Sequence, residues 1–162
     1  METAQEYVAR LLDLLGSDNP LDVLEMTPWR LSSLLSRFPE ERLPQRPMPT
    51  RWSASEIAIH LFEVEMVVGV RIRLVVGKCG IVIQSFDQDE WARRYQSQDL
   101  NGALTAFRAL RRMNLHFYRS LTPEQLNHYG IHDERGRESA LQMLKICAAH
   151  DLNHLKQLEY ML

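Results

Sequence analysis

The sequence of 162 residues has little of what marks secreted, membrane-embedded or nucleic-acid-binding proteins. Its two cysteines are too few for a disulfide framework, which is typical of a protein in a reducing cytoplasm. Nineteen lysines and arginines against 21 acidic residues leave a net charge of -2, so nothing favours binding to nucleic acid or to an anionic membrane surface. Small molecules are therefore the class of ligand that we expect.

Long apolar runs are also missing. The first six residues are acidic and have no apolar core, so we do not expect them to be a signal peptide. Two glutamates and two arginines interrupt the most apolar stretch, residues 57–76, which predicts that it does not span a membrane. With 45% apolar and 25% charged residues, we expect a single cytoplasmic domain over residues 1–162.

Helical periodicity covers most of the chain. Apolar residues recur at three- and four-residue spacing over residues 3–15, and a cluster of breakers at 16–20 ends that segment. Thr27-Pro28 is typical of an N-cap and a first helical residue, which predicts a helix over residues 29–37. Four prolines in residues 39–52 predict a connector rather than a helix.

The second half of the pattern begins with Ser53-Ala54-Ser55-Glu56, a capping box that predicts a long helix to about Val76. The other elements that we expect are a short helical piece near 89–95, a helix from Asp99 or Asn101 to about Ser120, a helical turn at Thr122, a loop over 128–136, and a helix from a second capping box at 139–142 to the end of the chain. We expect no strands.

These segments predict an all-α protein, a four-helix bundle. The connection from the helix that ends near Val76 to the helix that begins near Asp99 is roughly 20 residues long, whereas bundle hairpins usually need two to eight. A connection of this length can return along the bundle, so that the two helices run parallel. A folded loop would explain the length equally well.

Two histidines on the last helix, His150 and His154, lie four residues apart and therefore stack on one helix face. This is the spacing by which a helix offers two nitrogens to one metal ion. The pair alone is a weak signal, because roughly one random chain in five with six histidines would contain it. The glutamate of the zinc-protease motif is missing and Asp151 stands in its place, which excludes that class.

A third histidine, His60, lies near the start of the helix that begins at Ser53, between Ile59 and Leu61. Three histidines with an open position make a catalytic type of site for one divalent ion of zinc, nickel or iron. The alternative is that His60 is a histidine at the core edge bonded to a backbone carbonyl, and that the other two form a polar patch.

Three parts of the sequence together resemble the DinB-like superfamily. They are residues 52–61 (Trp-Ser-Ala-Ser-Glu-Ile-Ala-Ile-His-Leu) with Glu63 and Glu65, residues 87–91 (Asp-Gln-Asp-Glu-Trp), and residues 149–157 (Ala-His-Asp-Leu-Asn-His-Leu-Lys-Gln). The resemblance implies an up-down-down-up four-helix bundle, a divalent metal site at His60, His150 and His154, and often a homodimer. It also implies a metal-dependent hydrolase, or a transferase or isomerase that uses a low-molecular-weight thiol.

Two carboxylates are candidates to orient His60 or a water molecule at the metal. Glu56 lies four residues before His60 and Glu63 three residues after it, on the same helix face. The alternatives are that Glu56 is only the capping residue and that Glu63 is a solvated side chain.

Other polar residues have less specific roles. Gln157, three residues after His154, either reaches the pocket or bonds the backbone, and His132 is a candidate for the mouth of the site. We interpret Cys147 as a small buried hydrophobe rather than a ligand. We expect structural ion pairs for Glu65 with Arg71 or Arg73, and for Arg108 or Arg111. Asp87 and Asp89 are expected to cap the turn that follows them, and His116 and His128 to lie on the surface. Packing roles are expected for Trp29, Trp52 and Trp91.

Two classes of function follow from these observations. In the first, the protein is an enzyme in which a three-histidine metal ion activates water or a thiol. In the second, the bundle is a non-catalytic module that binds a small molecule or serves dimerisation.

Overall fold

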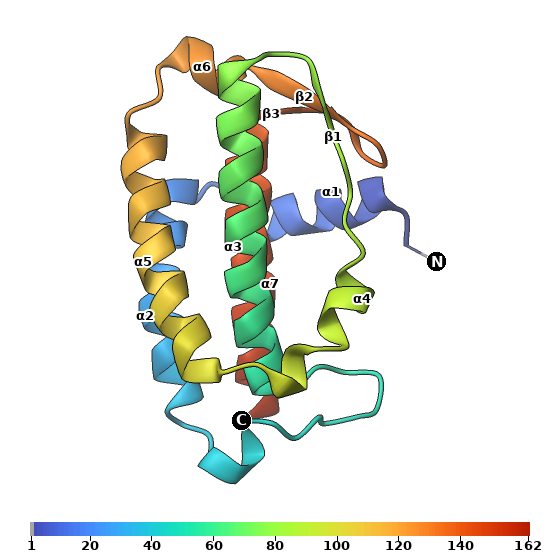
Figure 1. Ribbon diagram of the computed structural model, residues 1–162, viewed down its shortest axis with the longest axis vertical. Helices are drawn as coiled ribbons and strands as arrows, with labels where there is room; N and C mark the ends of the chain where they lie inside the picture. The colour runs from blue at the N-terminus through green and yellow to red at the C-terminus, as the bar shows by residue number, and fades with distance from the viewer. Residues whose placement is uncertain (1) are drawn as a thin grey trace.

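The computed structural model describes residues 2–162, and Met1, the first residue of the expected domain, lies outside them. Four long helices form a bundle, which confirms the predicted fold class. They are α2 (Pro20–Leu35), α3 (Ala54–Gly77), α5 (Leu100–Arg119) and α7 (Ala140–Met161). A further helix, α1 (Ala4–Leu15), lies across the bundle and packs on α7 (Figure 1).

The order of directions is the predicted up-down-down-up. In Figure 1, α2 and α7 run toward the end of the bundle that carries the C-terminus, whereas α3 and α5 both run away from it. The connection between α3 and α5 returns along the bundle as β1 (Ile81–Ile83), α4 (Gln88–Ala92) and the 3-10 turn η2 (Tyr95–Ser97). This connection, called the crossover below, therefore allows two consecutive bundle helices to be parallel.

Most helix starts are capped where the sequence indicates it. Ser53 and Thr122 form complete capping boxes, Asp99 caps α5, and Ser139 accepts the Gln142 N–H at the start of α7. The remaining short elements are the 3-10 turn η1 (Glu40–Arg42), in the connector before α3, and α6 (Pro123–Asn127).

The expected start at residue 29 is wrong, because α2 begins at Pro20 with Asn19 as its cap and contains Pro28 in its interior. A proline there has no N–H for the carbonyl four residues earlier, that of Leu24. The Nη1 of Arg111 donates to the Leu24 carbonyl at 2.7 Å instead. A contact from α5 therefore removes much of the penalty that makes proline a helix breaker.

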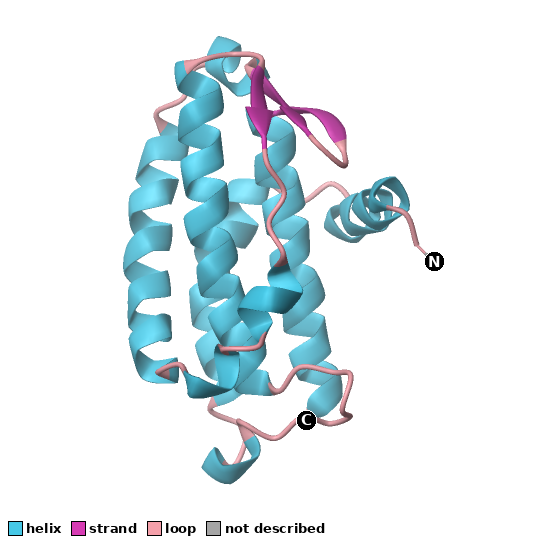
Figure 2. Cartoon of the chain, turned by 45° about the vertical axis from the view of Figure 1, so that its right-hand side comes forward, coloured by secondary structure: helices cyan, strands magenta, loops and turns pink. Residues whose placement is uncertain are grey.

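The expected loop over 128–136 is also wrong, because β2 (Tyr129–His132) and β3 (Gly136–Ser139) form a sheet with β1 at one end of the bundle (Figure 2). β1 pairs with β2 in parallel and β2 with β3 antiparallel. Strands of three or four residues are too short to show alternation in the sequence. The side chain of Ile83 packs so closely on Gly130 that a Cβ at residue 130 would collide with it. This contact also joins segments that are distant in the sequence, so no local pattern predicts it.

A buried ion network links three bundle helices. Arg111 of α5 lies with its Nε 2.8 Å from a Glu65 oxygen of α3 and its Nη1 2.8 Å from an Asp151 oxygen of α7. All three side chains are almost fully buried. Glu65 thus pairs with Arg111 and not with Arg71 or Arg73.

None of the helices within residues 2–162 combines the length and the apolar character that a membrane span requires.

Candidate metal centre

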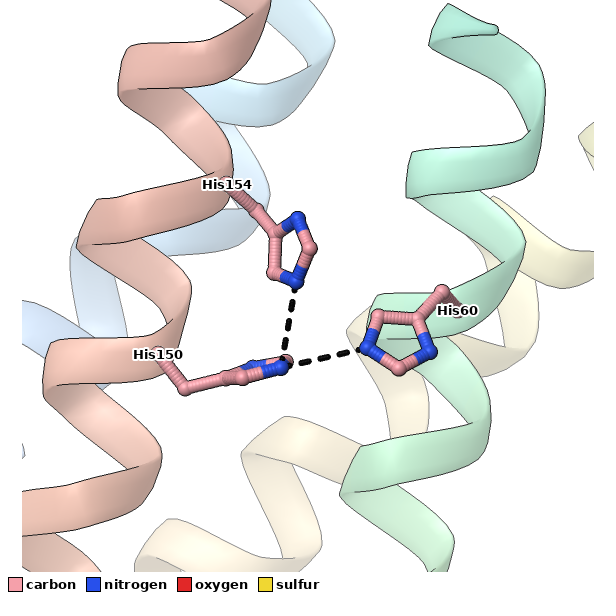
Figure 3. A group of neighbouring side chains, drawn as sticks. All are labelled: His60, His150 and His154. Atoms are coloured by element: carbon pink, nitrogen blue, oxygen red, sulfur yellow. Dashed lines mark hydrogen bonds between the residues drawn. The ribbon is translucent and has the colours of Figure 1, made fainter. Parts of the chain in front are cut away.

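Three histidines that are far apart in the sequence converge between α3 and α7 (Figure 3). The Nε2 atoms of His60 and His154 each lie 3.1 Å from the Nε2 of His150. His60 and His154 are buried, with 1% and 5% of their surface exposed, and His150 is half-buried. The structure therefore brings together the three residues that the spacing and the resemblance selected.

The capping box at the start of α3 helps to fix the position of His60. Ser53 accepts the Glu56 N–H, and the buried Glu56 carboxylate accepts the Ser53 N–H at 2.8 Å. Arg46, from the connector before α3, pairs with the same carboxylate at 2.6 Å. Glu56 is therefore the capping residue, as one of the two interpretations expected, and its Arg46 partner was not foreseen from the sequence.

Hydrogen bonds to the Nδ1 atoms orient two of the rings. The Nδ1–H of His154 donates to the Gln157 Oε1 at 2.9 Å, and the Nδ1 of His60 forms a hydrogen bond of 3.3 Å with the Tyr95 hydroxyl. Both bonds suit the tautomer with the proton on Nδ1, in which each Nε2 presents a lone pair to the centre. Gln157 thus contacts the site through His154, the first of its two expected alternatives.

Glu63 is not the solvated side chain of one expectation, because only 9% of its surface is exposed and it accepts a hydrogen bond from Gln98 at 3.1 Å. Burial and the neighbouring Glu63 carboxylate raise the pKa of the Tyr95 hydroxyl. Glu63 therefore affects His60 indirectly, through the Tyr95 hydroxyl that is hydrogen-bonded to the His60 Nδ1. Sequence reasoning missed Tyr95 because it lies in a short turn of the crossover, where periodicity gives no signal.

Burial keeps the three imidazoles neutral. Desolvation is the main cause, and it lowers the pKa of His150 to about 4 and that of His154 to about 3. The Arg111 charge adds to the effect at His150, and His150 adds to it at His154. The pKa of His60 is lowered still further. Neutral imidazole is the form that binds a metal ion.

The donor set fits a divalent cation. Zinc–nitrogen bonds of about 2.0–2.1 Å at tetrahedral angles place two nitrogen ligands about 3.3 Å apart, close to the 3.1 Å found here. Lone pairs of neutral rings that converge at this distance repel one another unless a cation or a proton lies between them. The Nδ1 of His150 is buried and has no partner among the described residues, so no hydrogen bond to that atom fixes the tautomer of this ring.

The histidine cluster opens into a cavity of about 720 Å³. Its walls come from α1, the connector before α3, α3 itself, α4 and α7. The Trp52 ring lies 4.5 Å from the ring of His60 and is stacked over that of His154 at 6.0 Å, so Trp52 walls the site. The expectation that Trp29 anchors packing is wrong, because 66% of it is exposed.

The remaining candidates lie elsewhere. His132 is on β2 and lines a neighbouring cavity, not the one at the histidine cluster. His116 is exposed, and His128 is half-buried against the Val76 carbonyl. Cys147 is packed in the core, as expected, and burial raises its pKa.

Known proteins resemble this chain in fold and over most of its length. The family model of the DinB superfamily matches residues 24–158. An Oceanobacillus iheyensis protein named "Putative metal-dependent hydrolase OB0782" is 24% identical over 136 residues, which cover 83% of this chain and 79% of that protein. The structure of YfiT from Bacillus subtilis, described as "a probable metal-dependent hydrolase with an unusual four-helix bundle topology", is 19% identical with a TM-score of 0.79 and covers 89% of this chain and 86% of its own.

Proposed function

Because this chain belongs to the DinB superfamily, we propose that it is a metal-dependent hydrolase whose divalent ion is held by His60, His150 and His154. The observation that carries the proposal is the convergence of the Nε2 atoms of three neutral imidazoles, two of them buried and one half-buried, beside an open cavity. The names of the two similar proteins, a putative and a probable metal-dependent hydrolase, support the class of reaction.

A divalent ion with three protein ligands and an open position supplies Lewis acidity, which acidifies water and polarises a carbonyl or phosphoryl oxygen. Around it, Gln157 and Tyr95 hold two of the imidazoles in the tautomer that leaves Nε2 free. Trp52 covers the rings of His60 and His154 and shields them from water.

The substrate in this proposal is a small molecule, because the cavity of about 720 Å³ has the size of a small-molecule site. Its lining combines charged and amide groups, from Arg10, Arg51, Asp89 and Asn153, with aromatic surface. Since α1, the connector, the crossover and α7 all contribute walls, we propose that residues 2–162 act as one domain.

Metal analysis of protein purified without a histidine tag tests the site. We expect close to one divalent ion per chain, and we expect the His150→Ala variant to lose it. His116→Ala, which removes an exposed histidine of α5, is the matched control and should keep the ion. Cobalt loading should give the visible absorption of four- or five-coordinate Co²⁺ in wild type and in the control only. A wild type that binds no ion would overturn the metal site.

Hydrolysis is tested separately, with a panel of small esters and amides and metal-loaded protein. We expect turnover that is lost on chelation and in the His150→Ala variant, and kept in His116→Ala. Equal turnover in wild type and His150→Ala would contradict the proposal. So would a metal-loaded protein that hydrolyses nothing in the panel but transfers a low-molecular-weight thiol to an electrophile.

A further inference from the structure

A second, narrower cavity of about 140 Å³ runs from the metal centre toward the sheet. Its lining includes His150, which also lines the larger cavity. Most of the other lining groups are apolar: Leu11 of α1, Val64 and Val68 of α3, Phe86 of the crossover, and Met143 and Ile146 of α7. We call this cavity the apolar channel. It has one metal-ligand candidate, His150, and a group of polar side chains in its wall.

The face of α3 that lines the apolar channel begins at the metal centre and ends at an arginine. His60, Val64, Val68 and Arg71 follow one another at spacings of four, four and three residues, which places them on one face of the helix. The backbone positions of His60 and Arg71 are roughly 16 Å apart along the helix axis. A ligand in the apolar channel can therefore contact both ends at once only if it is an elongated molecule.

Arg71 has no direct carboxylate partner among the described residues. Its guanidinium is half-buried, donates to the Gln84 carbonyl, and forms no ion pair with a carboxylate among the described residues. By contrast, the neighbouring Arg135 is paired with the buried Glu138 through two contacts of 2.5 and 3.0 Å. Burial, and then the charge of Arg135, lower the pKa of Arg71, and the carboxylates of Glu138, Asp133 and Glu134 oppose that effect from a distance. A ligand anion would form the direct ion pair that Arg71 lacks.

A buried ring nitrogen without a partner within residues 2–162 lines the same region. His132 is 2% exposed, and its Nδ1 accepts the Glu134 N–H at 3.2 Å and lies 3.1 Å from an oxygen of Asp133. With the Glu134 N–H donated to Nδ1, the proton of the neutral ring is on Nε2. That Nε2 is buried and has no partner among the described residues. His132 and Arg71 line the same cavity of about 540 Å³, which adjoins the apolar channel at Arg71 and Phe86. A buried donor without a partner is costly, and an acceptor on a ligand would satisfy it.

We propose that Arg71 and His132 bind an anionic group of the substrate, a carboxylate or a phosphate, while the apolar channel holds the chain that leads from it to the metal centre. This inference rests on the proposed hydrolase function and names its substrate class, an elongated amphipathic anion. Two N–H donors suit an anion, since charge-assisted hydrogen bonds are the strong ones, and Asp87 and Glu134 are the carboxylates that line the same cavity. The apolar lining suits a hydrocarbon segment between the two polar ends.

Calorimetric titration with octanoate tests the proposal, and 1-octanol and octyl phosphate are the comparison ligands. We expect octanoate to bind more tightly than the uncharged octanol, and the octyl phosphate titration shows which anion the site prefers. Arg71→Gln should raise the Kd of octanoate about tenfold or more and leave the Kd of octanol unchanged. Arg71→Lys should retain most of the affinity, and Arg37→Gln, an exposed arginine at the end of α2, should have no effect.

Equal octanoate affinity in wild type and Arg71→Gln, or equal affinity for octanol and octanoate, would overturn the proposal. If thermal unfolding shows that Arg71→Gln is not folded, NMR of the wild type gives the same answer. The Nε–H resonance of Arg71 is assigned by its loss in Arg71→Lys. It should shift with octanoate and not with octanol, and an unchanged resonance would overturn the proposal.

Titrating chelator-treated protein as well as zinc-loaded protein separates this inference from the proposed function. Octanoate binding that depends on Arg71 in metal-free protein supports the anion site whatever the metal analysis shows. Octanoate binding that vanishes with the metal and is unaffected by Arg71→Gln would mean that the carboxylate binds the ion directly, and would overturn the anion site. Failure of the metal site itself is detected by the metal content.

Discussion

Replacing Arg111 with methionine tests whether the ion network between the bundle helices depends on its single cation. The guanidinium lies within 2.8 Å of both Glu65 and Asp151, in a region almost closed to solvent. It also donates at 2.7 Å to the Leu24 carbonyl, which Pro28 cannot reach with an N–H. Methionine fills much of the same volume but supplies neither charge nor donor.

The expected magnitude follows from these contacts. Removing one partner of a buried ion pair costs about 3–5 kcal/mol, because the remaining charge stays buried without compensation. The orphaned Leu24 carbonyl places the loss at the upper end of that range, since an unpaired buried acceptor costs about 1–3 kcal/mol. In a domain of this size, each kcal/mol lost lowers the melting temperature by about 2–4 °C. Arg111→Met should therefore lower it by roughly 6–20 °C, a large part of a total stability of about 5–15 kcal/mol.

The loss should also depend on pH. Burial already raises the pKa of Glu65, and Arg111 is the main influence that opposes the rise. Without Arg111, the folded-state pKa of Glu65 rises further above its unfolded value, so the protonated carboxyl favours folding at low pH and this stabilisation is lost as pH rises. The deficit of Arg111→Met relative to wild type should therefore be smaller at pH 5 than at pH 7.

Urea unfolding of metal-free protein, followed by circular dichroism at both pH values, measures the loss. The control is the triple variant Glu65→Gln, Arg111→Met, Asp151→Asn, which removes all three charges and should recover most of the stability. A loss below about 1 kcal/mol at pH 7, or a triple variant no more stable than Arg111→Met, would refute the reasoning.

Three shorter predictions concern the site and the sheet. Metal-free wild type should lose stability as pH falls below 6.5. The reason is that His150 and His154, with folded pKa values of about 4 and about 3, take up protons first in the unfolded chain. A urea midpoint that stays constant from pH 7 to 4 would contradict this. Gln157→Leu should weaken zinc affinity about 10- to 100-fold, while Gln157→Glu, which keeps an acceptor, should not; competition with a chelator measures both. Gly130→Ala should cost about 1–3 kcal/mol in thermal unfolding, because the new Cβ would lie 2.6 Å from the Cγ1 of Ile83, and an unchanged melting temperature would show that Ile83 can move aside.

The bundle helices were predictable where local chemistry and periodicity agree. Ser53 and Glu56 mark the start of α3 because the capping box is formed by residues three apart. The start of α2 was mispredicted because Pro28 is a helix breaker by local rules, and only Arg111, from another helix, supplies the donor that Leu24 needs. The strands were missed for the same reason, since their pairing joins distant segments.

The candidate site divides in a similar way. His150 and His154 are visible as a pair through helical spacing, and His60 joined them through its place in a recognisable motif. Tyr95 and Trp52 were not assigned to the site because they come from the crossover and from the connector before α3. The conformations of these segments depend on what they pack against, which spacing along the chain does not encode.

The position of α1 has a consequence for how relatives of this protein can diverge. This helix precedes residues 24–158, the part that matches the superfamily, yet Tyr7 lines both the cavity at the histidine cluster and the apolar channel. All three candidate ligands lie inside the matched part. Part of the cavity wall thus lies outside the stretch that carries the three histidines, so exchanging α1 between relatives would be a way to alter which molecule is accepted while the three histidines stay as they are.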